Sequence, residues 1–267
     1  MTPSETTSAP GRPSGRPRPN PRRVIVRDVQ QLSPRMRRIT FEGDDLATFA
    51  WSGPAAHIKL IPPDAGSDAA PLIGPDDPRP NTVRTYTPRR FDAANRTLDV
   101  DFVLHGDGPV SSWAARAQAG QQLVVMGPGP GYKIDAEAAW YVLICDDAAL
   151  PAIETILEAL PATMPVTVFV EVAGPNEERP LRAGADVRWY ARPDDPQLAG
   201  SALSAALQKF AWPAGAGCVY IGCEATAMRK LRQEVLAASG LERTRVIGRG
   251  YWRIGAVNHP DRDYDEA

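Results

Sequence analysis

The sequence has few of the residues that build disulfide frameworks or zinc sites. It contains three cysteines and three histidines among 267 residues. Cys218 and Cys223 flank an apolar run typical of a buried strand, which favours core positions over a metal or redox pair. The histidines are scattered along the chain and lack the spacing of zinc ligands. We therefore expect no metal site, and free thiols in a reducing compartment.

Long hydrophobic runs and a strong net charge are also missing. No segment approaches the roughly 18 apolar residues of a membrane span. The first residues are Pro, Ser, Thr, Gly and Arg rather than the apolar core of a secretory signal. The 30 basic residues are offset by 32 acidic ones, which excludes the strongly basic surface of most nucleic-acid-binding proteins. We expect a cytoplasmic protein with no membrane span and no nucleic-acid partner.

The length allows one large domain or two medium ones, and the change of pattern along the chain predicts two domains between two tails. Residues 1–22 are rich in Pro, Ser, Thr and Arg and predict a disordered tail, and residues 256–267 form a second tail. The first domain, residues 23–133, contains six short β-like runs separated by Pro, Gly and Asp turns. This pattern predicts a six-stranded antiparallel barrel, with one helical interruption from Pro109 to Gln118.

The second domain, residues 134–255, has a different rhythm. Apolar strands such as WYVLIC, VTVFVEV and CVYIGC alternate with helical segments such as ALPAIETILEAL and ATAMRKLRQEVLAA. Strands that are apolar throughout must be buried on both faces, as in a parallel sheet covered by helices. The sequence therefore predicts a β-barrel followed by a Rossmann-like α/β domain.

Arg84-Thr85-Tyr86-Thr87 is the most informative strand of the predicted barrel. Arg84 and Tyr86 point to the same face of the sheet, because side chains alternate along a strand. A guanidinium there suits a diphosphate, and the phenol ring suits an adjacent aromatic ligand. Taken alone, the pattern equally fits a solvated cross-strand pair.

The segment from Asp101 to Ala114 reads as a strand, a Gly-rich turn and a helix start. The backbone N–H groups at such a helix start bind anions, and Gly106 and Gly108 would let a pyrophosphate approach closely. Ser111 or Ser112 is a candidate cap for the helix.

Four ordered segments resemble the siderophore-interacting proteins, a family of ferredoxin-reductase-like flavoenzymes. They are the Arg84 strand, the Asp101–Ala114 segment, Asp146–Ile153 and Gly250-Tyr251-Trp252-Arg253. The resemblance implies an FAD-binding barrel followed by an NAD(P)H-binding-like domain. It assigns FAD binding to Arg84, Thr85, Tyr86, Thr87, Asp101, Phe102, Val103, His105, Gly108, Pro109, Val110 and Ser111.

The chain departs from the family pattern at two places. Ala148 stands where the family's turn usually has Thr, and the turn from Gly127 to Gly131 lacks the family's Arg, whose role could fall to Lys133. Pro128 and Pro130 in this turn favour an interdomain connection over a dinucleotide fingerprint, which must open a helix.

The resemblance implies FAD-dependent reduction of a ferric siderophore, with NADH, NADPH or ferredoxin as electron donor. Lys59 matches the family strand whose lysine lines the substrate pocket, and Arg249 and Arg253 flank the Gly-Tyr-Trp segment. For Lys59 a solvated strand lysine is the alternative, and for one of the arginines a structural role. The alternative functions are a flavin reductase with another acceptor and a noncatalytic flavin or siderophore carrier.

Further side chains are candidates for contacts with the flavin and its donor. Tyr251 and Trp252 are expected either to shield the flavin ring or to pack in the core. Glu171 and Glu224 lie at strand ends of the second domain, where carboxylates can accept hydrogen bonds from ribose hydroxyls.

Overall fold

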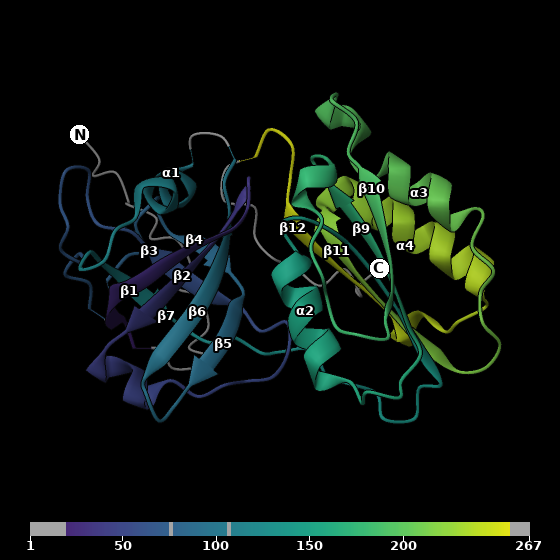
Figure 1. Ribbon diagram of the computed structural model, residues 1–267, viewed down its shortest axis with the longest axis horizontal. Helices are drawn as coiled ribbons and strands as arrows, with labels where there is room; N and C mark the ends of the chain where they lie inside the picture. Colours follow the sequence, from purple (N-terminus) through teal and green to yellow (C-terminus); the bar gives the residue numbers. More distant parts are fainter. Residues whose placement is uncertain (1–19, 75–76, 106–107, 257–267) are drawn as a thin grey trace, which may run out of the picture.

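The computed structural model describes residues 20–74, 77–105 and 108–256 as two halves, each built on one β-sheet (Figure 1). The predicted tails fall almost entirely outside the described residues, as does Gly106. Arg22, expected at the end of the first tail, is the first residue of strand β1. Its buried guanidinium donates to the carbonyl oxygen of Gly127 over 2.6 Å, which fixes the start of the strand.

The first sheet is antiparallel and has seven strands in the order β4-β3-β7-β1-β2-β6-β5. The strands are β1 (Arg22–Ser33), β2 (Met36–Glu42), β3 (Ile58–Ile61), β4 (Arg84–Tyr86), β5 (Pro88–Asp92), β6 (Thr97–Val103) and β7 (Gln122–Met126).

The seventh strand arises because the run expected as one strand divides at Thr87. β4 pairs with β3, whereas β5 pairs with β6 at the opposite edge of the sheet. One residue, Thr87, joins the two edges, so the sheet must curl until they meet. The result is a barrel, with Thr87 at its seam.

Alternation of apolar side chains fills the barrel. On β6, Leu98, Val100 and Phe102 are completely buried. Helix α1 (Pro109–Arg116) adds Trp113, whose ring stacks on Phe41 at a centroid distance of 6.2 Å. The predicted helical interruption is confirmed.

The second sheet is parallel, in the order β10-β9-β8-β11-β12. Its elements are β8 (Trp140–Asp146), α2 (Leu150–Ala159), β9 (Val166–Val172), β10 (Asp186–Ala191), α3 (Ser201–Leu207), β11 (Gly217–Glu224), α4 (Ala225–Ser239) and β12 (Val246–Trp252). Short 3-10 turns lie at Asp44–Thr48, Pro175–Glu177, Pro196–Leu198 and Arg243–Arg245.

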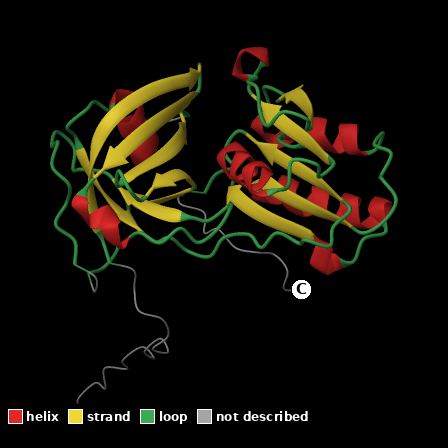
Figure 2. Cartoon of the chain, turned by 60° about the horizontal axis from the view of Figure 1, so that its bottom comes forward, coloured by secondary structure: helices red, strands yellow, loops and turns green. Residues whose placement is uncertain are grey.

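This order is that of a Rossmann-type half, with the direction of winding reversing between β8 and β11. Figure 2 shows the second sheet between its helices. The side chains of α2 pack with one face of the sheet, and those of α3 and α4 with the other. Every residue of β8 and β11 is buried, which explains their continuous apolar sequences. The predicted α/β fold is confirmed.

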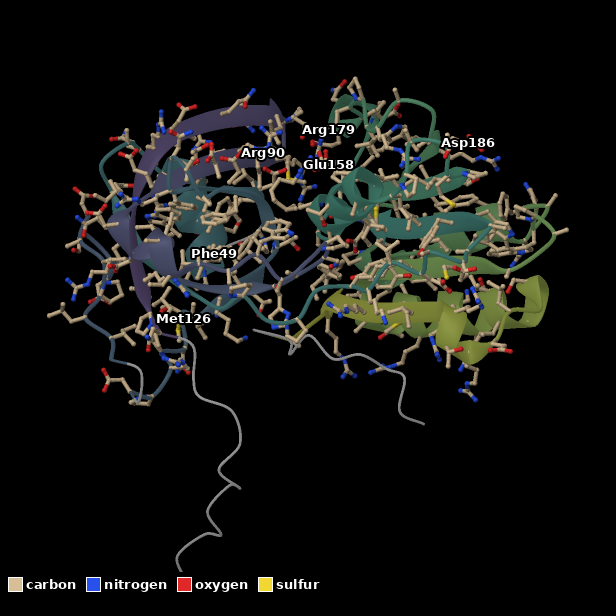
Figure 3. The ribbon with its side chains drawn as sticks, turned by 90° about the horizontal axis from the view of Figure 1, so that it is seen from below. Phe49, Arg90, Met126, Glu158, Arg179 and Asp186 are labelled. Carbon is tan, nitrogen blue, oxygen red and sulfur yellow. The ribbon has the colours of Figure 1, made fainter. Side chains whose placement is uncertain are left out.

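The two halves meet at a polar interface formed largely by α2 and β5. Arg89 is 6% exposed and donates two hydrogen bonds to Glu158, of 2.8 and 2.6 Å. Glu154 lies 3.5 Å from Arg89 and also pairs with Arg179. Figure 3 places Glu158 and Arg179 together at this junction. Among the described residues, no helix has the length and apolarity needed to cross a membrane.

Candidate functional site

A cavity of about 620 Å³ lies between the halves, and side chains from both line it. This volume falls within the roughly 300–1,000 Å³ of small-molecule and cofactor sites. The structure brings ten of the residues expected at the FAD site to its wall: Arg84, Thr85, Tyr86, Thr87, Asp101, Val103, His105, Gly108, Val110 and Ser111.

Strand β4 presents Arg84 and Tyr86 to this cavity. Nη1 of Arg84 donates to the carbonyl oxygens of Asn81 and Val83 over 2.7 and 2.8 Å, which holds the guanidinium in place. Among the described residues, Arg84 has no acidic partner within ion-pair distance. The ring of Tyr86 lies against Phe102 at a centroid distance of 4.7 Å, and burial raises the pKa of its phenol. The guanidinium of Arg84 is therefore fixed in position to bind an anion, beside the protonated phenol of Tyr86.

The start of α1 supplies backbone N–H groups beside that cation. No side chain among the described residues caps α1; its N-cap is Gly108. Ser111, expected as a candidate cap, instead accepts from the N–H of His105 over 3.0 Å and donates to the carbonyl oxygen of Val103 over 3.3 Å. These bonds fold the chain back after β6 and leave first-turn donors for an anion.

Asp101 lies at the cavity wall but its carboxylate is occupied. Arg38 donates two hydrogen bonds to it, of 2.7 and 2.8 Å, and Asp101 is 2% exposed. The pair joins β2 to β6. Asp101 therefore fixes the strand that leads into the glycine turn.

The other expected site residues do not line the cavity. Phe102 is buried in the barrel core, and Pro109 begins α1. Lys59 is exposed and donates from Nζ to Oγ1 of Thr85 over 3.1 Å, next to the cavity wall. Arg249 is buried and donates to the carbonyl oxygen of Ala55 over 3.2 Å, whereas Arg253 is exposed beyond β12.

Several residues that the sequence did not single out complete the cavity wall. Arg35 and His57 come from the barrel, and Asp147 and Arg192 come from the α/β half. The N–H of Leu104 donates to the carbonyl oxygen of Arg35 over 2.7 Å, which places Arg35 beside the glycine turn. Asp147 lies within the Asp146–Ile153 segment, whereas no local motif marks Arg35, His57 or Arg192, which the fold brings to the cavity.

The aromatic pair before Arg253 also lines the cavity. The indole N–H of Trp252 donates to Asp146 over 2.7 Å, and the hydroxyl groups of Tyr251 and Tyr220 are 3.1 Å apart. Both rings are half-buried. Tyr251 and Trp252 therefore pack partly in the core and partly line the cavity.

The turn from Gly127 to Gly131 connects the halves. The N–H of Gly129 donates to the carbonyl oxygen of His57 over 2.7 Å, and a Cβ atom at Gly129 would lie 2.1 Å from Nε2 of that histidine. Lys133 is exposed and does not line the cavity, whereas Ala148 does.

His105 carries a pH-dependent charge at the site. Desolvation lowers its pKa, as do the charges of Arg35 and Arg192, although Asp147 acts in the opposite direction. The unfolded chain therefore binds a proton at this residue more readily, so stability is lost as the pH falls below about 6.5. We expect the melting temperature of FAD-free protein to fall less between pH 7.5 and 5.5 in His105→Asn than in wild type. Equal falls would contradict this account.

Comparison with known proteins gives consistent matches. The siderophore-interacting FAD-binding domain matches residues 25–132, and the siderophore-interacting protein domain matches residues 138–255. The chain is 30% identical to ferric vibriobactin reductase ViuB of Vibrio cholerae, over 84% of this chain and 86% of that one. It is 28% identical to the NADPH-dependent ferric-chelate reductase of Escherichia coli, over 86% and 92%.

A solved structure, a siderophore utilization protein from T. fusca, superimposes with a TM-score of 0.78 at 38% identity. The match covers 90% of this chain and 95% of that one. These relatives confirm the predicted oxidoreductase class and the ferredoxin-reductase-like fold. The chain belongs to the siderophore-interacting protein family.

Proposed function

We propose that this protein uses FAD to reduce a ferric siderophore and release ferrous iron, with electrons from NADH, NADPH or ferredoxin. The observation that carries the proposal is the single cavity that joins the Arg84 wall and the α1 start to residues of the α/β half. An electron donor and an acceptor must both reach a flavin, and a site between two domains allows this.

The residues of the cavity fit FAD. Arg84 and the uncapped start of α1 supply a guanidinium and backbone N–H groups for its diphosphate. Tyr86 and Thr87 follow Arg84 along the cavity wall and are placed to contact the ring system of FAD. Trp252 lines the same cavity from the α/β half. Bound FAD would supply the transfer of electrons from a two-electron donor to a one-electron ferric acceptor.

A basic side chain at the cavity could attract an anionic ferric chelate. Arg35 lines the wall. We propose Lys59, Arg249 and Arg253 as further substrate residues on the family resemblance, although they lie outside the cavity lining and Arg249 is buried. Oxygen ligands hold the softer, less charged ferrous ion less tightly, so reduction weakens the complex. Cys145, Cys218 and Cys223 are buried free thiols, which supports a cytoplasmic location.

The proposal is tested with anaerobic FAD-loaded protein, a ferric siderophore and a colorimetric ferrous chelator. We expect NADH, NADPH or reduced ferredoxin to bleach the flavin, and the ferric siderophore to restore its colour as ferrous iron forms. A flavin reductase for another acceptor would be reoxidised by a quinone but not by the siderophore. A noncatalytic carrier would not be bleached by any donor.

Lys59→Ala tests the proposed substrate contact. Because this lysine is exposed, its loss should raise the KM for an anionic ferric chelate only about twofold to fivefold and leave kcat unchanged. Lys133→Ala, which removes an exposed charge away from the cavity wall, is the matched control. An unchanged KM in Lys59→Ala would remove Lys59 from the site.

A further inference from the structure

Three parallel strands of the α/β half end at or beside buried carboxylates. Asp146 and Glu224 are the last residues of β8 and β11, and Glu171 is the penultimate residue of β9. Each is at most 2% exposed. Asp146 and Glu224 lie where the winding of the sheet reverses, which is where open α/β sheets bind their ligands.

Asp146 accepts hydrogen bonds from N–H groups on both sides of the position where the winding of the sheet reverses. Its Oδ1 accepts from the amides of Ala148 and Ala149 over 3.0 and 3.4 Å, ahead of α2. Its Oδ2 accepts from the amide of Glu224 over 3.1 Å and from the indole of Trp252 over 2.7 Å. Burial and Asp147 raise the pKa of Asp146 to about 7, whereas Arg192 and the hydrogen bond from Trp252 act in the opposite direction.

Glu224 and Glu171 accept hydrogen bonds from backbone amides at the starts of the other two helices, α4 and α3. Glu224 accepts from the amides of Thr226 and Ala227 over 2.6 and 2.8 Å, in the first turn of α4. Glu171 accepts from the amide of Gly200, the N-cap of α3, over 3.0 Å. In α2, Pro151 has no N–H to offer.

In dinucleotide-binding α/β folds the pyrophosphate lies at the start of the helix after the first strand, which corresponds here to the amides ahead of α2. The starts of α3 and α4 carry backbone N–H groups of the same kind at the ends of neighbouring strands. A carboxyl group that accepts hydrogen bonds from them occupies the donors a pyrophosphate would need, and its ionised form also repels the phosphates. Arg192 is the one Lys or Arg that the described residues of this half contribute to the cavity wall. Its guanidinium is paired with Asp147 at 2.8 Å and with Glu171 at 3.4 Å.

From this geometry we propose that Asp146, Glu171 and Glu224 exclude a dinucleotide pyrophosphate from the strand ends, and that Asp147 keeps Arg192 from binding it. The inference rests on the proposed function and concerns how a nicotinamide donor binds. The nicotinamide ring of the donor enters the cavity, and its ADP part contributes little to the binding free energy.

The direct test is calorimetric titration of FAD-saturated protein with ADP-ribose, which carries the pyrophosphate but no nicotinamide. We expect no saturable binding below about 1 mM, a free energy weaker than about −4 kcal/mol. Saturable micromolar binding would overturn the inference. The readout needs no turnover, so it decides the inference even if no nicotinamide reduces the flavin and the proposed donor fails.

A kinetic test compares NADH with reduced nicotinamide mononucleotide, which has the same ring but no ADP part. Bleaching of bound FAD, followed by anaerobic stopped flow, should give second-order rate constants within about threefold of each other. A preference for NADH of more than about 100-fold would show that the ADP part is held and would contradict the inference.

Asp147→Asn should raise the affinity for ADP-ribose, because it removes the negative charge that pairs with Arg192 at 2.8 Å and leaves the longer contact of 3.4 Å with Glu171. A hydrogen bond between charged groups corresponds to about 10- to 100-fold in affinity, which would bring ADP-ribose binding into the measurable range. Asp194→Asn is the matched control, since it removes an exposed carboxylate from the same wall and Asp194 does not pair with Arg192. Equal FAD content would show that both variants are folded, and an unchanged ADP-ribose titration in Asp147→Asn would then contradict the proposed role of this pair.

Discussion

Arg84→Ala is expected to weaken FAD binding by about 10- to 100-fold, the loss that follows removal of a hydrogen bond between charged groups. The guanidinium is held by the carbonyl oxygens of Asn81 and Val83 and faces the cavity without an acidic partner among the described residues. Its charge is therefore free for a diphosphate. The dissociation constant is measured by titrating flavin-free protein with FAD and following the quenching of flavin fluorescence.

Arg90→Ala is the matched control for this variant. Arg90, labelled in Figure 3, is an exposed arginine of β5 that does not line the cavity. We expect it to bind FAD as wild type does. Undiminished FAD binding in Arg84→Ala would remove Arg84 from the site, and equal losses in both variants would point to a general effect of positive charge.

Arg89→Met is expected to lower the melting temperature by about 5–10 °C. Breaking a buried ion pair destabilises a protein by about 3–5 kcal/mol, and the partial exposure of Glu158 reduces this to about 2–3 kcal/mol. Arg89 binds Glu158 through two hydrogen bonds, so its loss removes this pairing between the halves, whereas Glu154 keeps its ion pair with Arg179. Calorimetry of FAD-free protein gives the shift.

Arg90→Met provides the comparison, because it makes the same substitution one residue along β5 on an exposed side chain. Its melting temperature should stay within about 1–2 °C of wild type. If Arg89→Met has the same melting temperature as wild type, the pairs of Arg89 with Glu158 and Glu154 do not hold the halves together.

The sequence predicted the barrel wall of the site better than the opposite wall. Arg84, Tyr86 and Gly108 carry local signals, namely strand alternation and a glycine turn before a helix, and they do line the cavity. Arg35 and Arg192 carry no such signal. They reach the same cavity because a β-turn and an edge strand from distant parts of the chain meet there.

The strand division at Thr87 and the carboxylate caps show two limits of local patterns. Nothing in the run around Thr87 distinguishes one long strand from two strands at opposite edges, since pairing partners decide this. Glu171 and Glu224 were candidates for hydrogen bonds from ribose hydroxyls; both are buried and accept from backbone amides. Which donors reach a carboxylate depends on tertiary contacts.

The most direct measurement of the central claim is a visible-absorbance titration of the purified protein with FAD. The account predicts saturable uptake of one FAD per chain, with the bands of an oxidised isoalloxazine retained after gel filtration. A colourless protein that takes up no FAD from an excess would contradict it.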